Sequence, residues 1–160
     1  MATKTTSQAA RKALIGRLML ALRRSSAAGV LHGQTIARRI GINSTDLECL
    51  DLILMQGPST AGDIARHTGL TSGAVTGLID RLERLGLVER AADPGDRRKV
   101  LVRVREDRIA PIAALYAPME KSMQALLGSY SKEELKALID FSECAGDIVL
   151  KRVAELNEKK

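Results

Sequence analysis

The sequence predicts a mainly α-helical protein with one small β-hairpin, and three observations carry this prediction. Apolar residues recur at intervals of three and four along most of the chain, which is the periodicity of amphipathic helices. Two short helical segments follow each other across a turn, residues 67–70, that contains a glycine. Directly after them, two segments of strand composition flank a turn at residues 93–96. A helix-turn-helix followed by a β-hairpin is a winged helix, here with additional helices at the N- and C-terminal ends.

The segment before the winged helix is expected to be helical with one break. Leu14, Leu18 and Leu22 recur every four residues, which predicts an amphipathic helix that ends near Ala28 and Gly29. Residues 35–40 would add one or two further turns. Ser44 is expected to cap the next helix. Its apolar face is formed by Leu47, Leu50, Ile53 and Leu54.

The two short helices of the helix-turn-helix have clear start and stop residues. Ser59 or Thr60 caps a helix over residues 61–67, and Gly69 ends it. Thr71 or Ser72 caps the following helix, which ends at Gly86. The apolar stripe of this second helix is formed by Val75, Leu78, Ile79, Leu82 and Leu85.

The wing and the C-terminal helices follow. Residues 87–90 and 100–104 are predicted strands, joined by a turn in which Pro94 presets φ and Gly95 allows a positive φ. A helix over residues 107–128 has an apolar seam with a heptad-like spacing. Ser131 and Glu134 form a capping box for the last helix.

This order of elements divides the chain into two regions. Residues 35–105 form the winged helix-turn-helix, and residues 1–34 and 106–160 form helices expected to pair with a second copy of the chain. The alternative is that the long helices form an intrachain core, but few other elements are left to cover their apolar seams.

Charge and composition restrict the function. The net charge is +6, and the last 55 residues are mildly acidic, so the positive charge lies in the first two thirds of the chain. Aromatic residues make up 2%, which argues against base stacking on aromatic platforms. The sequence contains no catalytic triad or phosphate-binding loop, so we expect no enzyme, cofactor or metal site. With no apolar run long enough to span a membrane and no secretory signal, a cytoplasmic location is expected.

The second short helix has the chemistry needed to read duplex DNA. Ser72 and Thr76 can hydrogen-bond to base edges or phosphates, and Gly73 keeps the backbone close to the groove. Arg81 and Arg84 lie further along the same helix. The turn of the hairpin places three cations, Arg97, Arg98 and Lys99, where a wing contacts the minor groove. Asp96 is expected to orient an Arg or cap the turn. A polar helix start can also be only an N-cap, and a charged turn only a solvated one.

With these residues the sequence resembles the MarR family of bacterial transcription regulators. The segment TSGAVTGLIDRLERLGLVERAADPGDRRKVLVRV, residues 71–104, carries the resemblance. It implies a homodimeric repressor with interlocked terminal helices, bound to a pseudo-palindromic double-stranded DNA operator. Carried over onto this chain, the DNA contacts are Ser72, Gly73, Thr76, Arg97 and Arg98. Ser59 and Thr60 resemble backbone contacts, and Thr71, Arg81, Arg84 and Lys99 complete the candidate interface.

The chain departs from the family pattern after the second wing strand, where a Leu-Thr pair and a later Gly are usual. Here the residues are Arg105, Glu106 and Asp107, and Asp107 is expected to replace the usual cap. Family members transmit ligand binding through this junction, so the regulation of this chain can differ.

The resemblance also implies a small-molecule effector, anionic or aromatic, in a cleft between the dimer helices and the winged helix. The candidate lining residues are Arg17, His32, Met55, Tyr116 and Met119. The alternatives are an effector-independent DNA-binding protein and a winged helix that docks another protein. Cys49 and Cys144 are expected to be small core residues rather than a redox switch.

Overall fold

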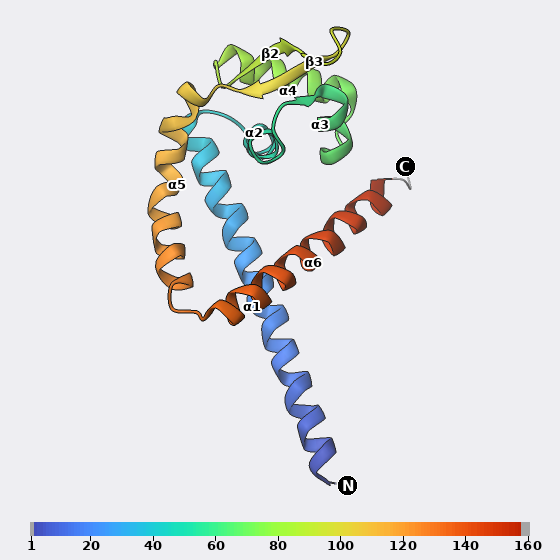
Figure 1. The fold of residues 1–160 in the computed structure, drawn as a ribbon, viewed down its shortest axis with the longest axis vertical. Coiled ribbons are helices and arrows are strands. Elements are labelled where there is room, and N and C mark those ends of the chain that lie inside the picture. The colour runs from blue at the N-terminus through green and yellow to red at the C-terminus, as the bar shows by residue number, and fades with distance from the viewer. Residues whose placement is uncertain (1, 158–160) are drawn as a thin grey trace. The chain divides into compact units, whose positions relative to one another are not determined.

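The computed structural model describes residues 2–157 and divides into two units, Met1–Glu48 and Cys49–Lys160 (Figure 1). The first unit contains α1 (Ala2–Ile40) and the start of α2 (Ser44–Gln56). The second unit contains the rest of α2 and all later elements, which are β1 (Ser59–Thr60), α3 (Ala61–Thr68), α4 (Ser72–Arg84), β2 (Val88–Ala92), β3 (Val100–Val104), α5 (Glu106–Leu127) and α6 (Lys132–Asn157).

In the first unit, α1 is one continuous helix, so the predicted end near Ala28 and Gly29 is wrong. A glycine that ends a helix usually takes a positive φ. Gly41 does so, with φ of 76°, and it ends α1, whereas Gly29 is not among the glycines with positive φ. The predicted cap of α2 is also one residue off. The Asn43 side chain, not that of Ser44, accepts the first-turn N–H, from Asp46 at 2.8 Å.

In the second unit, the helix-turn-helix has the predicted caps. Thr60 and Asp63 form a reciprocal capping box at the start of α3, and Gly69 ends this helix in the left-handed conformation with φ of 70°. The Thr71 hydroxyl accepts the N–H of Ala74 at 3.3 Å and so caps α4. Of the alternatives left open by the sequence, the structure selects Thr60 and Thr71.

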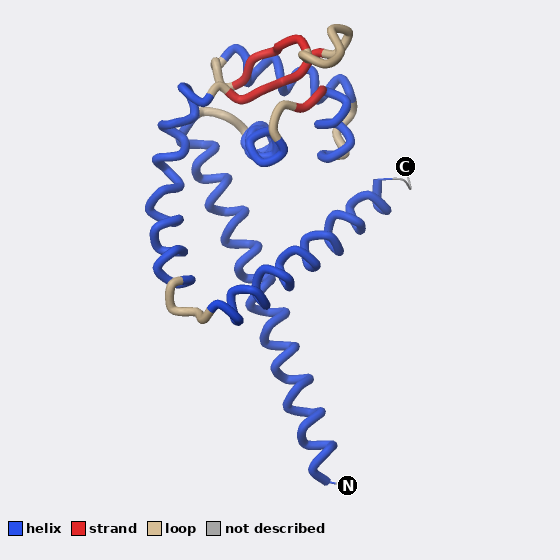
Figure 2. Tube along the Cα trace, in the orientation of Figure 1, coloured by secondary structure: helices blue, strands red, loops and turns tan. Residues whose placement is uncertain are grey.

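The wing is part of a three-stranded antiparallel sheet with the order β1-β3-β2 (Figure 2). In the register of the hairpin, Val88 pairs with Val104 and Ala92 with Val100. The third strand, β1, was not expected, and it pairs Ser59 with Val102. The linker that caps α3 is therefore also hydrogen-bonded to the wing, and β3 has a neighbour on each side.

The core of the second unit lies between the elements of the winged helix and α2. Its fully buried apolar side chains come from α2, α3, α4 and the hairpin, and they include Leu50, Ile53, Ile64, Val75, Leu78, Ile79, Leu82, Val88 and Val102. The predicted stripe of α4 is buried except for Leu85 at its end, and Leu54 of α2 is exposed as well. Cys49 is buried, as expected.

The helices after the wing are α5 and α6. Unlike the elements that form the core, they leave large apolar side chains exposed. Arg105 occupies the N-cap position of α5 without a side-chain cap hydrogen bond, so the expected cap by Asp107 is wrong. The Asp107 carboxylate instead accepts a hydrogen bond from Arg105 at 3.0 Å. The capping box of α6 is confirmed, because the Ser131 N–H donates to Glu134 at 2.8 Å and the Glu134 N–H donates to the Ser131 hydroxyl at 3.2 Å.

Large apolar residues of α6 are exposed along its length. They include Leu138, Ile139, Phe141, Ile148, Val149, Leu150, Val153 and Leu156. Cys144 on the same helix is also exposed, so the prediction that it is a core residue is wrong. The helix periodicity is correct, but within one copy of the chain these side chains lie outside the core.

Candidate nucleic-acid interface

The start of α4 presents a short, polar and open surface. Ser72, Gly73 and Thr76 are exposed. The Thr76 hydroxyl donates to the Ser72 carbonyl at 3.0 Å, a bond that leaves its oxygen lone pairs free to accept from a base edge or a water. A Cβ built on Gly73 would meet nothing within 4 Å, so this face is not packed against the protein. An exposed helix N-terminus of this shape is suited to enter the major groove of DNA.

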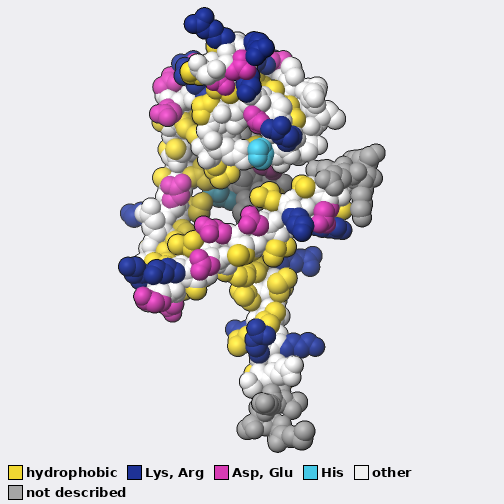
Figure 3. All heavy atoms as spheres, turned by 45° about the vertical axis from the view of Figure 1, so that its right-hand side comes forward, with side chains coloured by type: hydrophobic (Ala, Val, Ile, Leu, Met, Phe, Trp, Pro, Cys, Tyr) yellow, Lys and Arg dark blue, Asp and Glu magenta, His cyan; other side chains and the backbone are white. Residues whose placement is uncertain are grey.

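The tip of the wing holds three exposed cations, Arg97, Arg98 and Lys99. The Asp96 carboxylate accepts the backbone N–H of Arg98 at 3.1 Å and its Nε–H at 3.4 Å. Asp96 thus both closes the turn and orients the Arg98 side chain, which is 93% exposed. Lys and Arg side chains project from the wing end of this unit in Figure 3. Such a tip is suited to bind phosphate or the minor groove.

Arg84, near the end of α4, is exposed, and its Nε–H donates to the Asp80 carbonyl at 3.3 Å. Arg81 is exposed as well. Both side chains therefore reach solvent from the helix that begins with Ser72, although they lie more than two turns away from its start.

A further arginine, Arg90 of β2, ties the wing to α4, and the sequence reasoning gave it no role. Its guanidinium contacts Asp80 at 2.5 Å and also pairs with Glu83. The hydrogen bond that Arg90 donates to Asp80, followed by the charges of Glu83 and Asp80, raises the pKa of Arg90 above its ordinary value. The signal was present in the sequence as two acids three residues apart on a helix, followed by an Arg on the next strand. The two ion pairs tie α4 to the hairpin.

Ser59 and Thr60 have structural hydrogen bonds in the linker. Ser59 is buried, and its hydroxyl donates to the Gly57 carbonyl at 2.9 Å. The Thr60 hydroxyl donates to the Asp63 carboxylate at 2.6 Å and accepts the Asp63 N–H at 3.1 Å. The Thr60 backbone N–H also donates to this carboxylate, at 3.0 Å. The two bonds that the Asp63 carboxylate accepts from Thr60 lower its pKa below the ordinary value of 3.8. The contacts of this linker with DNA stay a prediction.

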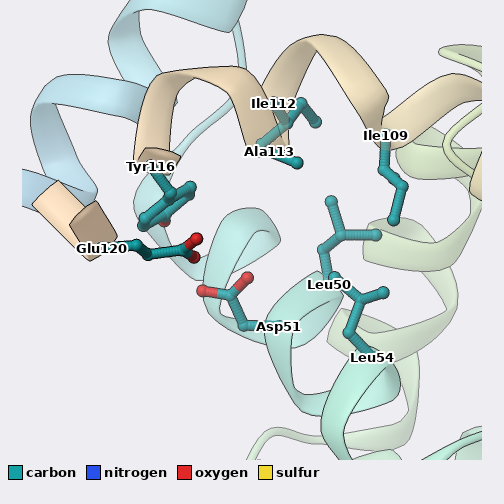
Figure 4. Close-up of a pocket in the computed structure, with 8 residues that line it drawn as sticks. All are labelled: Leu50, Asp51, Leu54, Ile109, Ile112, Ala113, Tyr116 and Glu120. Atoms are coloured by element: carbon teal, nitrogen blue, oxygen red, sulfur yellow. The ribbon is translucent and has the colours of Figure 1, made fainter. Parts of the chain in front are cut away.

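The second unit also contains a cavity, between α2 and α5, with a volume of about 210 Å³ (Figure 4). It is lined by Leu50, Asp51, Leu54, Ile109, Ile112, Ala113, Tyr116 and Glu120. Of the predicted effector residues in this unit, the cavity includes Tyr116 but neither Met55, which is 79% exposed, nor Met119. Arg17 and His32 belong to the first unit, so their part in an effector site stays a prediction.

Over the residues that the structure describes, no group of three or more His, Cys, Asp or Glu side chains is arranged to hold a metal ion. No helix in the same part of the chain is long and apolar enough to cross a membrane.

The exposed helix start, the cationic wing and the anchoring arginine define a winged-helix DNA-binding protein. Comparison with known proteins gives the family. The profile of the MarR family matches residues 40–99. The HTH-type transcriptional regulator YcgE of Bacillus subtilis is 37% identical over 81% of this chain and 84% of its own length. The chain belongs to the MarR family, whose members are transcriptional regulators and not enzymes.

Solved structures agree with this assignment. A MarR family protein from Bacillus stearothermophilus is 25% identical, with a TM-score of 0.61, over 89% of this chain and 97% of its own. BpsR of Bordetella bronchiseptica, whose DNA binding is regulated by 6-hydroxynicotinic acid, is 26% identical, with a TM-score of 0.51, over 83% and 93% of the two chains. The predicted fold class, mainly helical with a small wing, is confirmed.

Proposed function

We propose that this protein is a repressor that binds a pseudo-palindromic operator as a homodimer in the cytoplasm. The observation that carries the proposal is the placement, on one winged-helix unit, of an exposed polar helix start and an exposed cationic hairpin tip. The first reads base edges in the major groove and the second holds phosphates or the minor groove.

In this proposal the residues divide into base readers and backbone contacts. Ser72, Gly73 and Thr76 face the bases because they form the first turns of α4 and are exposed. Arg97, Arg98 and Lys99 bind phosphates or the minor groove, because they are exposed cations at the wing tip. Arg81 and Arg84 contact the backbone that borders the groove. Thr71 contributes through its cap, which orders the start of the helix.

The apolar surface of α6 supports the homodimer. Ile148 is 70% exposed, Leu150 64% and Val149 61%, and large exposed apolar areas mark sites of interaction with another protein. In the first unit, α1 likewise exposes Leu14, Met19 and Leu20. A second copy of the chain would cover these faces and hold two winged helices at a spacing of about 34 Å, one helical turn of DNA.

The DNA binding of BpsR is regulated by a small molecule, and this supports a small-molecule effector for the present chain too. A ligand bound at the junction of α5 and the winged helix would change the separation of the two recognition helices, and with it the affinity for the operator. Release of the operator by the effector would end repression.

The experiment is a binding-site selection with the full chain and random duplex DNA, followed by fluorescence anisotropy on the selected site over a range of salt concentrations. We expect a two-fold symmetric site and a logarithm of affinity that falls linearly with the logarithm of salt concentration. The Thr76→Val variant should change the base preferred in each half-site, while Thr5→Val, far from the winged helix in sequence, should not.

Three outcomes would contradict the proposal. Selection of no preferred sequence would favour a protein-docking module. A selected site without two-fold symmetry would contradict the dimer on DNA. Equal loss of affinity on all sequences for Thr76→Val would contradict the base-reading role of this residue.

A further inference from the structure

The cavity between α2 and α5 is amphipathic, with apolar walls and a polar end. Leu50 and Leu54 come from α2, and Ile109, Ile112 and Ala113 come from α5. Figure 4 shows the carboxylates of Asp51 and Glu120 facing each other at one end, beside the ring of Tyr116, with the isoleucines at the other end. The volume of about 210 Å³ is smaller than the sites of drug-sized ligands, so a small molecule would fill it.

The charge at the polar end is negative. The eight lining residues contribute two carboxylates, and none of the eight is Lys, Arg or His. Burial, together with the charge of the nearby Asp51, raises the pKa of Tyr116 above its ordinary value of 10.0. The phenol is therefore neutral near pH 7 and can donate or accept a hydrogen bond. An anion placed here would meet two like charges in partly desolvated surroundings, which opposes its binding.

We propose that this cavity binds a small organic cation, an ammonium or amidinium group carried on a compact apolar or aromatic body. The cation would lie between Asp51 and Glu120, where charge-assisted hydrogen bonds are stronger than neutral ones. The Tyr116 ring would add a cation–π contact, and the apolar body would contact Leu50, Leu54 and Ile112. The inference deepens the proposed function by naming the class of effector, and it differs from the anionic effector that the family resemblance implies.

The position of the cavity allows the binding of a cation to affect the DNA-binding residues. Ile109 and Ile112 lie in the first two turns of α5, which follows β3 after one residue. The backbone N–H of Arg105 in this junction donates to the Leu87 carbonyl at 2.9 Å, just before β2. A ligand that draws α2 and α5 together would therefore act on the base of the wing.

The test uses three probes of one shape and different charge, namely benzylamine, benzyl alcohol and benzoate, with calorimetry on the full-length protein at pH 7. We expect benzylamine, which is protonated at this pH, to bind at least about tenfold more tightly than benzyl alcohol. Benzoate should bind more weakly than benzyl alcohol. Benzylamine should also weaken operator binding measured by anisotropy.

The variants locate the site. Asp51→Asn combined with Glu120→Gln should remove the preference for the cation, while Glu133→Gln, which removes an exposed carboxylate of α6 outside the cavity, should leave it unchanged. Ala113→Leu, which fills the cavity, should weaken both benzylamine and benzyl alcohol. Circular dichroism of each variant shows whether it is folded. Tyr116→Phe is a further, nearly isosteric variant, and it should weaken cation binding only slightly.

Tighter binding of benzoate than of benzylamine would overturn the inference, as would a cation preference that survives loss of both carboxylates. If none of the three probes binds, because a second copy of the chain closes the cavity, the inference is overturned as well. Operator selection on the protein without ligand separates this failure from failure of the proposed function, because sequence-specific DNA binding would persist in the first case and be absent in the second.

Discussion

Removal of the Arg90 guanidinium should loosen the wing from the recognition helix. Arg90→Met keeps most of the aliphatic length of the side chain but loses the ion pairs with Asp80 and Glu83. The Arg90 side chain is 33% exposed and its partners are more exposed, so each pair contributes in the range of exposed ion pairs, about 0.2–1 kcal/mol. Repulsion between the two carboxylates left on α4, three residues apart, adds about 0.2–0.5 kcal/mol.

The expected loss is about 1–1.5 kcal/mol of unfolding free energy, which lowers the melting temperature by about 3–5 °C. Operator affinity should fall by about three- to tenfold, because the binding energy must then also order the wing relative to α4. Denaturant unfolding and anisotropy measure the two effects. The matched control is Arg103→Met, which breaks one isolated pair with Glu89 on the same hairpin and should cost less than about 0.5 kcal/mol.

A double-mutant cycle of Arg90→Met and Asp80→Asn isolates the interaction. We expect a coupling of about 0.5–1 kcal/mol. A coupling below about 0.2 kcal/mol, or an equal loss for Arg103→Met, would refute the view that Arg90 anchors the recognition helix.

Three further predictions concern the wing tip, the dimer and the start of α3. Arg98→Ala should weaken DNA binding about tenfold on specific and random duplexes alike, and should reduce the salt slope by about one for each wing; an effect confined to the operator would contradict a phosphate contact. Ile148→Asp, at a side chain 70% exposed in one chain, should leave the winged helix folded but convert the dimer to a monomer in light scattering, and an unchanged mass would remove α6 from the interface. Asp63→Asn should lower stability at pH 7, because its pKa is lower in the folded than in the unfolded chain. That stabilisation is present above the ordinary value of 3.8 and is lost as pH falls through the folded-state pKa, so the two proteins should converge in acid unfolding curves. A difference that persists at low pH would point to another cause.

The winged helix could be predicted from the sequence because its signals are local. Thr60 with Asp63 and the glycines at positions 69 and 86 mark helix ends by their own hydrogen bonds and backbone angles. The alternating valines of β3 mark a strand, and Val102 at its centre is buried. The caps, the turn and the apolar stripe of α4 all agreed, and such agreement makes a local prediction reliable.

The errors occur where the outcome depends on more than neighbouring residues. Gly29 is found in a helix because the surrounding turns are favourable enough to absorb the cost of about 1 kcal/mol for a helical glycine. The strand at Ser59 exists only through pairing with Val102, 43 residues later, and a two-residue segment carries no periodicity of its own. Arg90 was overlooked because its partners lie on a different element, so the two acids of α4 and the arginine of β2 come into contact only in the folded unit.

The candidate DNA interface was largely present in the sequence, while the character of the cavity was not. Small polar residues at a helix start and three successive cations in a turn are readable signals. The pairing of Asp51 with Glu120 requires that α2 and α5 lie together, which is a property of the folded unit. Met55 and Met119 do not line this cavity, and the spacing of methionines shows only which face of a helix they occupy.

The central place of β3 in the sheet confines the mobility of the wing to its tip. Ladder pairs hold the hairpin from Val88 and Val104 up to Ala92 and Val100, and β1 holds β3 from the other side. Beyond them, the Asp93 N–H donates to the Lys99 carbonyl at 3.1 Å and the Lys99 N–H donates to the Asp96 carbonyl at 2.8 Å. Only the few residues of this loop have to be ordered when the cations bind DNA, so the entropic cost of binding is small. The hairpin that carries the loop behaves as a rigid element.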